Sequence, residues 1–248
     1  MEWQDEGLIL GSRKHGETSA IVEMMTQNHG RHLGLVRGGR SARMRPVLQP
    51  GNSATIVWRA RLEDHLGMFA IEPGKLRAAE LMASPSGIYG VQMLACHLRL
   101  LPERDPHPGL YEAASVLLDN FSFPEIAASL MVRFELALLD ELGFGLDLKS
   151  CAATGQTNDL VFVSPKSGRA VSADAGKPWS DRMLVLPDFL RGTRKDTSSM
   201  PSVTSIEDGF RLTGFFLERH IYGARGIRHP DERLGFIKNL VKQEKSNG

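Results

Sequence analysis

The sequence predicts an α+β protein of several domains, with an N-terminal five-stranded OB-fold barrel followed by an α-helical domain. Three observations predict this class. Short segments rich in strand formers, separated by glycine-containing turns, fill roughly the first 70 residues. From Lys75 onward the apolar residues recur at steps of three and four, which is the period of a helix. A hairpin-like segment interrupts this helical half, so we place the domains at residues 1–74 and 75–248, with the insertion at about residues 147–180.

The composition is that of an ordinary globular protein, because 42% of the 248 residues are hydrophobic and 24% are charged. The formal net charge is only +1, so an attraction to nucleic acid has to come from an uneven distribution of charge. Two cysteines, Cys96 and Cys151, are too few for a disulfide framework. The first residues lack the pattern of a signal peptide, and no apolar run is long enough to span a membrane. We therefore expect a reduced, cytoplasmic protein.

Five strands are expected in the first domain, separated by turns. The turns Asn28-His29-Gly30 and Pro50-Gly51-Asn52 consist of residues that tolerate or favour the backbone angles of tight turns. A small SH3-like barrel fits the strands nearly as well as an OB-fold, and the pattern alone leaves both open. The expected strands are at residues 7–13, 20–26, 31–37, 53–59 and 67–72.

Helices are expected through most of the second domain. Ser84 followed by Pro85 is typical of a helix start, since serine caps the first turn and proline suits the first helical position. The strongest helical period has a broad apolar stripe, which predicts a mostly buried helix that ends at Gly143. The expected helices are at residues 84–101, 110–120, 123–142, 181–190, 203–222 and 231–242, with a hairpin at 160–163 and 169–172 and a polar loop at 191–202.

Positive charge is concentrated in the first domain. Residues 24–62 contain no Asp or Glu but seven Arg, many of them in a loop loosened by Gly38 and Gly39. Guanidinium groups donate paired hydrogen bonds to phosphate oxygens, so this window makes binding of an anionic polymer as good an interpretation as an ordinary solvated loop, and the residues leave both open. The candidate nucleic-acid-binding residues are Arg13, Lys14, Arg31, Arg37, Arg40, Arg43, Arg45, Arg59 and Arg61.

Aromatic side chains for base stacking are sparse in the same domain, which holds only Trp3, Trp58 and Phe69. Stacking on aromatic rings and contact with the phosphate backbone are the two ways to bind single strands of any sequence. We therefore expect contacts with the phosphate backbone to dominate.

Catalytic and metal-binding signatures are missing from the sequence. There is no phosphate-loop lysine motif, no HExxH and no GxSxG, and the carboxylates of the helical half lack a two-metal spacing, so we expect no enzyme. His29 and His32 have no carboxylate or thiolate nearby to complete a metal site. Cys151 is the one usable zinc ligand in the hairpin region, so we expect a degenerate, zinc-ribbon-like hairpin without metal, and no cofactor. The other positions of such a site hold Thr154, Ser172 and Ala175.

Several segments are similar to those of RecO, a bacterial family of recombination mediators that anneal DNA. In the first half the similar segments are GETSAIV at residues 16–22, residues 26–30, RGGR at residues 37–40 and LQPG at residues 48–51. In the second half they are FELALL at residues 134–139, LGF at residues 142–144 and CAxxG at residues 151–155. The resemblance covers nearly the whole chain, and the order and spacing of the segments make it specific.

This resemblance implies an OB-fold on a helical domain with an inserted ribbon, and a protein without enzymatic activity that works at the nucleoid in DNA repair and recombination. It implies binding to single- and double-stranded DNA, annealing of complementary strands, and help in loading RecA onto strands coated by single-strand-binding protein (SSB). The implied partners are RecR and the acidic C-terminal tail of SSB. Many members carry four cysteines in the ribbon, where this chain keeps only Cys151.

The residues by themselves leave two other functions open. One is an RNA- or ribosome-associated OB-fold protein, whose basic loop would look the same. The other, ranked last, is an enzyme that uses the first domain as a nucleic-acid clamp. An annealing assay without nucleotide or metal separates DNA annealing from both.

A binding site for the SSB tail would lie in the helical domain, as the resemblance implies. An acidic tail with an apolar end needs an apolar pocket with cations at its rim. The helices expected at residues 123–142 and 203–222 offer apolar walls, although any single arginine near them could simply solvate a helix surface. The candidate cations are Arg133, Arg211, Arg219 and Arg225.

Overall fold

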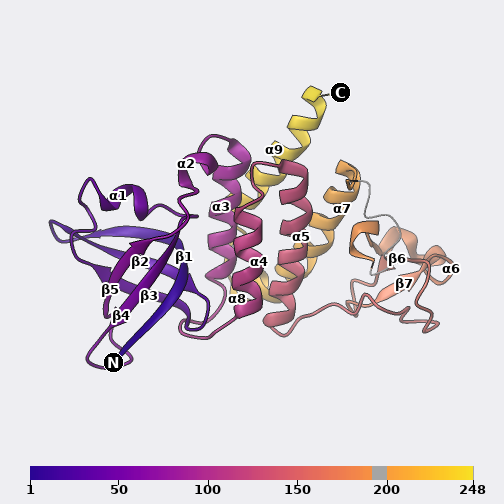
Figure 1. Ribbon diagram of the computed structural model, residues 1–248. Helices are drawn as coiled ribbons and strands as arrows, with labels where there is room; N and C mark the ends of the chain where they lie inside the picture. The colour runs from indigo at the N-terminus through magenta and orange to yellow at the C-terminus, as the bar shows by residue number, and fades with distance from the viewer. Residues whose placement is uncertain (192–199, 248) are drawn as a thin grey trace. The chain divides into compact units, whose positions relative to one another are not determined.

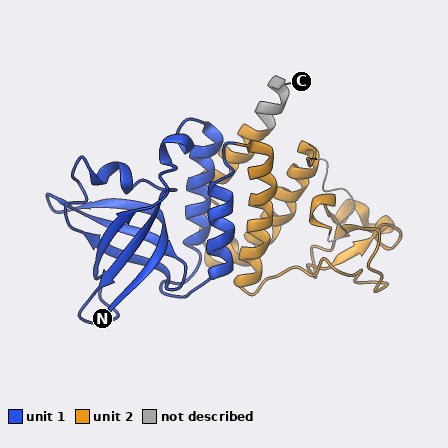
Figure 2. Ribbon diagram, in the orientation of Figure 1, with its two compact units in different colours: residues 1–122 blue, residues 123–248 orange. Residues whose placement is uncertain are grey.

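The computed structural model describes residues 1–191 and 200–247, with side chains as far as residue 240, and Figure 1 shows the course of the chain. The chain forms two compact units, Met1–Ser122 and Phe123–Gly248, which Figure 2 colours separately. Most of the polar loop predicted at residues 191–202 lies outside the described residues. Within the described part, no helix is both long and apolar enough to cross a membrane.

The first unit begins with a closed barrel of five strands. The order around the barrel is β1-β2-β3-β5-β4, and all neighbours are antiparallel except β3 and β5, which meet in parallel at Leu35 and Met68. The long strand β1 closes the barrel, because it pairs with both β2 and β4. The predicted OB-like barrel is thus confirmed. The strands β1 to β5 span Glu2–His15, Ser19–Thr26, Gly30–Val36, Ser53–Arg59 and Met68–Pro73.

Strand β1 begins at Glu2, well before the predicted start at residue 7. Its first residues are mostly polar or acidic, so an apolar pattern does not mark them as a strand. Pairing with β4, with Trp3 opposite Trp58, satisfies their backbone groups and holds them in the sheet. The other four strands agree with the predicted ranges to within one residue at each end.

The interior of the barrel is filled by the inward-facing side chains of the strands. Trp58 is 1% exposed, Phe69 is 4% exposed, and Met24 is fully buried. Gly34 makes room for this packing, since a β-carbon there would lie 2.5 Å from the Phe69 ring. Buried and more exposed residues alternate along β3 and β4, so the charged side chains of these two strands lie on the outer surface of the barrel.

Besides the barrel, the first unit contains two short and two longer helices, and the segment that follows α3 runs back to the barrel. Helix α3 begins as predicted, with Ser84 Oγ accepting a hydrogen bond of 3.0 Å from the backbone N–H of Gly87. The segment after α3 runs alongside β3, and the N–H of Arg104 donates to the carbonyl of Arg31 at 2.9 Å. Helix α3 ends at Leu98, before the predicted end at residue 101. Helices α1 to α4 span Met44–Val47, Ala78–Leu81, Pro85–Leu98 and Pro108–Leu118.

The second unit is built on three long helices, α5, α7 and α9, which pack against one another. Helix α5 confirms the predicted buried helix, because Met131 and Leu138 are fully buried and Phe134 is 2% exposed. One π-helical turn, labelled η3, follows α7. The helical elements α5, α7, η3, α8 and α9 span Pro124–Glu141, Val203–Leu217, Glu218–Tyr222, Gly223–Arg225 and Asp231–Asn247.

A small sheet with the order β7-β6-β8 lies in the second unit and confirms the predicted hairpin. The helix predicted at residues 181–190 is wrong. Its central residues form strand β8, which pairs with β6, and Pro187 disfavours a helical backbone at the residue before it. The strands β6 to β8 span Leu160–Val163, Ala170–Ser172 and Leu184–Val185, with α6 at Ala173–Gly176 and 3-10 helices at Lys177–Arg182 and Asp188–Leu190.

Candidate nucleic-acid interface

A cavity of about 340 Å³ lies on the barrel between β1, the start of β2 and the loop after β3. We call it the basic pocket. Four cations line it, and none of its lining residues is acidic, so it is suited to an anion. The cations are Arg13, Lys14, Arg40 and Arg45.

The loop after β3 is fixed in place by the turn between β1 and β2. The N–H of Arg40 donates to the carbonyl of Thr18 at 3.0 Å, and Arg40 Nη1 donates to the carbonyl of Gly16 at 2.8 Å. Gly38 has a positive φ of 67°, which glycine adopts at little cost and which lets the loop turn back. The glycine-rich segment is therefore an ordered support for the cations of the basic pocket.

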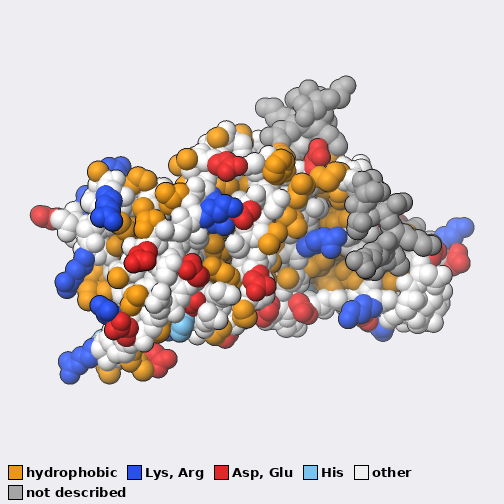
Figure 3. Space-filling model, viewed as in Figure 1, with side chains coloured by type: hydrophobic (Ala, Val, Ile, Leu, Met, Phe, Trp, Pro, Cys, Tyr) orange, Lys and Arg blue, Asp and Glu red, His pale blue; other side chains and the backbone are white. Residues whose placement is uncertain are grey.

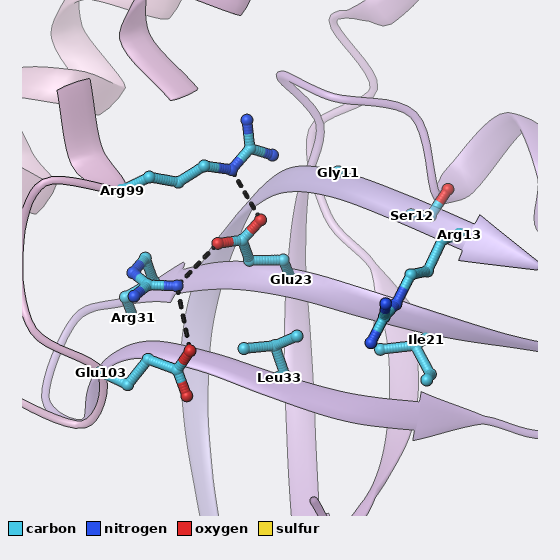
Figure 4. A pocket seen from close by; sticks show the side chains of 9 residues that line it. All are labelled: Gly11, Ser12, Arg13, Ile21, Glu23, Arg31, Leu33, Arg99 and Glu103. Atoms are coloured by element: carbon cyan, nitrogen blue, oxygen red, sulfur yellow. Dashed lines mark hydrogen bonds and ion pairs between the residues drawn. The ribbon is translucent and has the colours of Figure 1, made fainter. Parts of the chain in front are cut away.

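A second cavity, of about 400 Å³, lies on the same barrel and holds charges of both signs. We call it the mixed-charge pocket (Figure 4). Glu23 lies at its centre and accepts hydrogen bonds of 2.8 Å from both Arg31 Nη1 and Arg99 Nε. Arg31 Nη1 is also 3.3 Å from a carboxylate oxygen of Glu103. Ser12 and Arg13 line both pockets, so the two cavities are neighbours on one surface.

The structure brings together some of the predicted nucleic-acid-binding residues and separates others. Arg31 lies in the mixed-charge pocket, and Arg59 pairs with the exposed Glu2 at 2.8 Å. Figure 3 shows Lys and Arg side chains spaced along the outer edge of the barrel. Like Arg59, the remaining three predicted residues are exposed and line neither pocket, namely Arg37, Arg43 and Arg61.

Sequence reasoning missed Arg99 and the carboxylates that pair with Arg31. The acid-free window begins just after Glu23, and the structure places that residue beside Arg31. Arg99 follows α3 and lies far outside the window, so no local pattern connects it with the barrel. The one feature of the sequence that indicates this pairing is that successive side chains of a strand point to opposite faces, which puts Glu23 on the outer face of β2.

The aromatic side chains of the barrel offer little surface for base stacking. Trp58 and Phe69 are buried, and the half-buried Trp3 stacks on His29 with ring centroids 4.0 Å apart. The expectation that His29 has no carboxylate nearby was wrong, since its Nδ1 lies 2.7 Å from Asp5 Oδ2. The antiparallel pairing of the neighbouring strands β1 and β2 brings Asp5 to that position, beside the turn after β2.

Metal ligands do not gather anywhere in the described part of the chain, where no group of three or more suitable side chains occurs. Cys151 is 1% exposed and its Sγ lies 3.3 Å from the N–H of Ser172 and 3.4 Å from Ser172 Oγ. Burial raises the pKa of the Cys151 thiol, but hydrogen bonds from Ser172 and Thr154 outweigh it and lower the pKa to about 6. Ser172 thus partners the sulfur at a position where a zinc ribbon would supply a ligand.

In the second unit, a cavity of about 310 Å³ lies between α7 and the start of α9. We call it the helical pocket. Phe210, Pro230 and Leu234 give it apolar walls, and the cations Arg211 and Arg233 line it as well.

Of the four predicted partner-binding cations, Arg211 is the one that lines the helical pocket. Arg133 instead donates to the carbonyl of Phe189, with its guanidinium 5.8 Å from the centre of that ring. Arg219 donates to the carbonyl of Pro165 at 2.5 Å. Arg225 is exposed at the end of α8.

The closed five-stranded barrel with a cation-lined cavity defines this chain as an OB-fold protein with an additional helical unit. It belongs to the RecO family. The family model described as "Recombination protein O N terminal" matches residues 1–75, and the model "Recombination protein O C terminal" matches residues 88–228.

Relatives of this family are similar over almost the entire chain. A protein of Mesorhizobium japonicum is 59% identical over 245 residues, which is 98% of this chain and 94% of the relative. A protein of Rhizobium etli is 58% identical over 242 residues, covering 98% and 93% of the two chains. A protein of Chelativorans is 55% identical over 242 residues, covering 98% and 96%. All three carry the name "DNA repair protein RecO".

Proposed function

We propose that this protein acts in recombinational DNA repair without enzymatic activity, by binding single- and double-stranded DNA of any sequence and annealing complementary strands. The observation that carries the proposal is the basic pocket, where four cations from three segments meet without an acidic lining residue. Phosphates are common to DNA of every sequence, so cations arranged in this way bind DNA without recognising its base sequence. The scarcity of accessible aromatic rings supports binding through the backbone.

Annealing follows from the same chemistry. Two complementary strands repel one another, and a protein surface that neutralises their phosphates lowers this repulsion while the bases remain free to pair. The barrel has few rings to hold the bases, which favours a surface that leaves them exposed for pairing. The nine residues of the proposed interface are Arg13, Lys14, Arg31, Arg37, Arg40, Arg43, Arg45, Arg59 and Arg61.

The test is DNA binding by a variant of the basic pocket, in which Arg13, Arg40 and Arg45 are all changed to Gln. Affinity of the intact protein for a labelled single strand is measured by anisotropy at several salt concentrations. If about four cations contact phosphates, the logarithm of affinity falls with the logarithm of salt at a slope of roughly −3 to −4. The variant is expected to bind more weakly and to show a flatter slope for every sequence.

A matched control removes the same charge from the second unit, by changing three ion-paired surface residues to Gln. The control is expected to keep the wild-type affinity. Equal loss in both variants would mean that only net charge matters and would count against the basic pocket. The control residues are Arg169, Arg182 and Arg228.

Annealing is measured with complementary labelled strands, without nucleotide or added metal. The protein is expected to speed annealing, and the basic-pocket variant to lose most of the effect. The alternative function, an RNA- or ribosome-associated OB-fold protein, is tested in the same assay by competition with an RNA strand of identical sequence. RNA that competes far better than DNA would favour that alternative.

We further propose that the protein helps to load RecA onto SSB-coated DNA at the nucleoid, with RecR as a partner and the SSB tail bound in the helical pocket. This pocket combines apolar walls with the exposed Arg211, which pairs with Asp208 at 2.6 Å, and this suits a peptide that is acidic and ends in apolar residues. Arg233 also lines the pocket, but its charge is paired with the buried Glu135. Binding of a labelled SSB-tail peptide to the full-length protein is expected to weaken in Leu234→Asp and Arg211→Glu. The matched control is Arg182→Glu, an exposed cation of the second unit that does not line the helical pocket. Binding lost in the control alone would place the tail elsewhere.

A further inference from the structure

In the mixed-charge pocket, a carboxylate occupies the guanidinium groups that a DNA phosphate would otherwise contact. Glu23, on β2, accepts one hydrogen bond of 2.8 Å from Arg31 and one of 2.8 Å from Arg99. Figure 4 shows these three side chains pointing toward one another, with Leu33 below them and Arg13 further along the strands. The side chain of Glu23 is 16% exposed, and those of Arg31 and Arg99 are 14% and 42% exposed, so the group is open to solvent on one side.

We propose that Glu23 is a built-in competitor for a DNA phosphate. In the free protein its carboxylate occupies the position between Arg31 and Arg99, and a phosphodiester of the bound strand replaces it there. Carboxylate and phosphate oxygens accept the same hydrogen bonds from guanidinium groups, so one can substitute for the other. This inference rests on the proposed function and adds a residue that limits DNA affinity.

The surroundings of the pocket favour this exchange. A cavity of about 400 Å³ is within the range of sites that hold small ligands, so it has room for part of a nucleotide. Arg13 and Ser12 line both this cavity and the basic pocket, so a strand that contacts the basic pocket has neighbouring phosphates close to Glu23. A strand that is bound at the basic pocket can therefore supply the phosphate that replaces Glu23, and no second DNA molecule is needed.

Both arginines keep other contacts that hold them in place when Glu23 is displaced. Arg99 Nη2 donates to the carbonyl of Leu10 at 3.2 Å, and Gly11 permits this approach, because a β-carbon there would lie 3.0 Å from Arg99 Nη2. Arg31 Nε donates to the carbonyl of Leu101 at 3.4 Å, and Arg31 also pairs with Glu103. Glu23 is therefore one of several supports for these cations.

The decisive variant is Glu23→Gln, which keeps the size of the side chain and removes its charge. Freeing Arg31 and Arg99 is expected to raise affinity for single-stranded DNA by about tenfold and to steepen the salt slope by about 1 to 2, since more counterions are released on binding. The dissociation rate of a labelled strand is expected to fall by a similar factor. Glu72→Gln is the matched control, because it removes one charge from an exposed position on β5 that forms no ion pair within the described residues. This control is expected to change affinity by less than about twofold.

A purely structural role for Glu23 makes the opposite prediction. In that case Glu23→Gln lowers the unfolding temperature, and DNA binding stays the same or weakens, which would overturn the inference. A double variant, Glu23→Gln with Arg99→Gln, is expected to lose much of the gained affinity. A gain that persists in full would show that Arg99 does not contact phosphate.

Arg99→Gln alone keeps the inference testable if Glu23→Gln does not fold. It is expected to weaken DNA binding about threefold and to flatten the salt slope by about 1, and unchanged binding would overturn the proposal. Failure here is distinguishable from failure of the proposed function. If the wild-type protein binds DNA and the basic-pocket variant does not, the function stands even where Glu23→Gln has no effect. If the wild-type protein does not bind DNA, the function itself fails.

Discussion

Glu135 on α5 and Arg233 on α9 form a buried ion pair, with Glu135 Oε1 2.8 Å from Arg233 Nε and Glu135 Oε2 3.0 Å from Arg233 Nη2. Glu135 is fully buried, and Arg233 is 7% exposed. Thr213 on α7 donates to the same carboxylate, and Arg233 donates to the carbonyl of Phe210 at 2.7 Å. Three helices are thus joined through one carboxylate. Gly214 admits the guanidinium, since a β-carbon there would lie 3.0 Å from two of its nitrogens.

Arg233→Met is expected to destabilise the protein by about 3 to 5 kcal/mol, because it leaves the charge of Glu135 buried without a partner. The double variant with Glu135→Leu is expected to recover a large part of this loss, since no charge is then buried. Urea unfolding of the wild-type, single and double variants measures both effects. Equal losses in the single and double variants would mean that packing, and not the unpaired charge, dominates.

His32 predicts a pH dependence of stability. Burial lowers the pKa of His32 below its ordinary value of 6.5, and the residue is 4% exposed among the rings of Trp3 and Trp58. The unfolded chain then takes up the proton more readily than the folded one, so this contribution is present above pH 6.5 and is lost as pH falls toward the folded pKa.

The measurement is urea unfolding at about pH 7.5 and about pH 5.5 for the wild-type protein and His32→Leu. The wild-type protein is expected to lose more stability between these conditions than the variant. An identical loss in both would assign the pH dependence to groups other than His32.

The exposed cations of the loop after β3 predict a uniform effect on DNA binding. Changing Arg37, Arg40 and Arg43 to Ala is expected to flatten the salt slope by about 2 to 3 and to weaken binding equally for all sequences. The check is anisotropy with strands of several compositions, after circular dichroism has shown that the variant is folded. Unchanged binding in the folded variant would remove this loop from the proposed interface.

Zinc content is expected to be far below one atom per chain, because Cys151 stands without the other ligands of a ribbon. Cys151→Ser is expected to cost less than about 1.5 kcal/mol of stability, since a hydroxyl can accept the hydrogen bond from Ser172 at nearly the same place. Elemental analysis and thermal unfolding of both proteins check these statements. Stoichiometric zinc that disappears in the variant would show that Cys151 holds the metal together with other ligands.

The elements that sequence reasoning predicted are those fixed by local chemistry. Alternation in β3 and β4, the cap at Ser84 and the apolar stripe of α5 each follow from a few adjacent residues. Strand β8 was missed because it has two residues and exists through its pairing with β6. Local pattern cannot reveal a strand of that kind.

The sequence was sufficient to predict which cations form the candidate interface, but not which carboxylates pair with them. Arg13, Lys14, Arg40 and Arg45 were identified from a charge pattern, and the structure places them around one cavity. The pairing of Arg31 with Glu23, and the arrival of Arg99 from the end of α3, depend on how the chain closes on itself. Charged residues that are separated in the sequence therefore determine how accessible each cation is to a phosphate.

The return of the chain to the barrel after α3 has a consequence for exchanging parts between relatives. Arg99 and Glu103 form one side of the mixed-charge pocket, although both lie beyond residue 75, where the match to the N-terminal family model ends. A chimaera joined at residue 75 would pair the strands of one protein with pocket residues of another. A junction after Ser122 keeps the whole compact unit and all of its pocket residues together. Recombination between diverged genes would be expected to preserve function more often at the second junction than at the first.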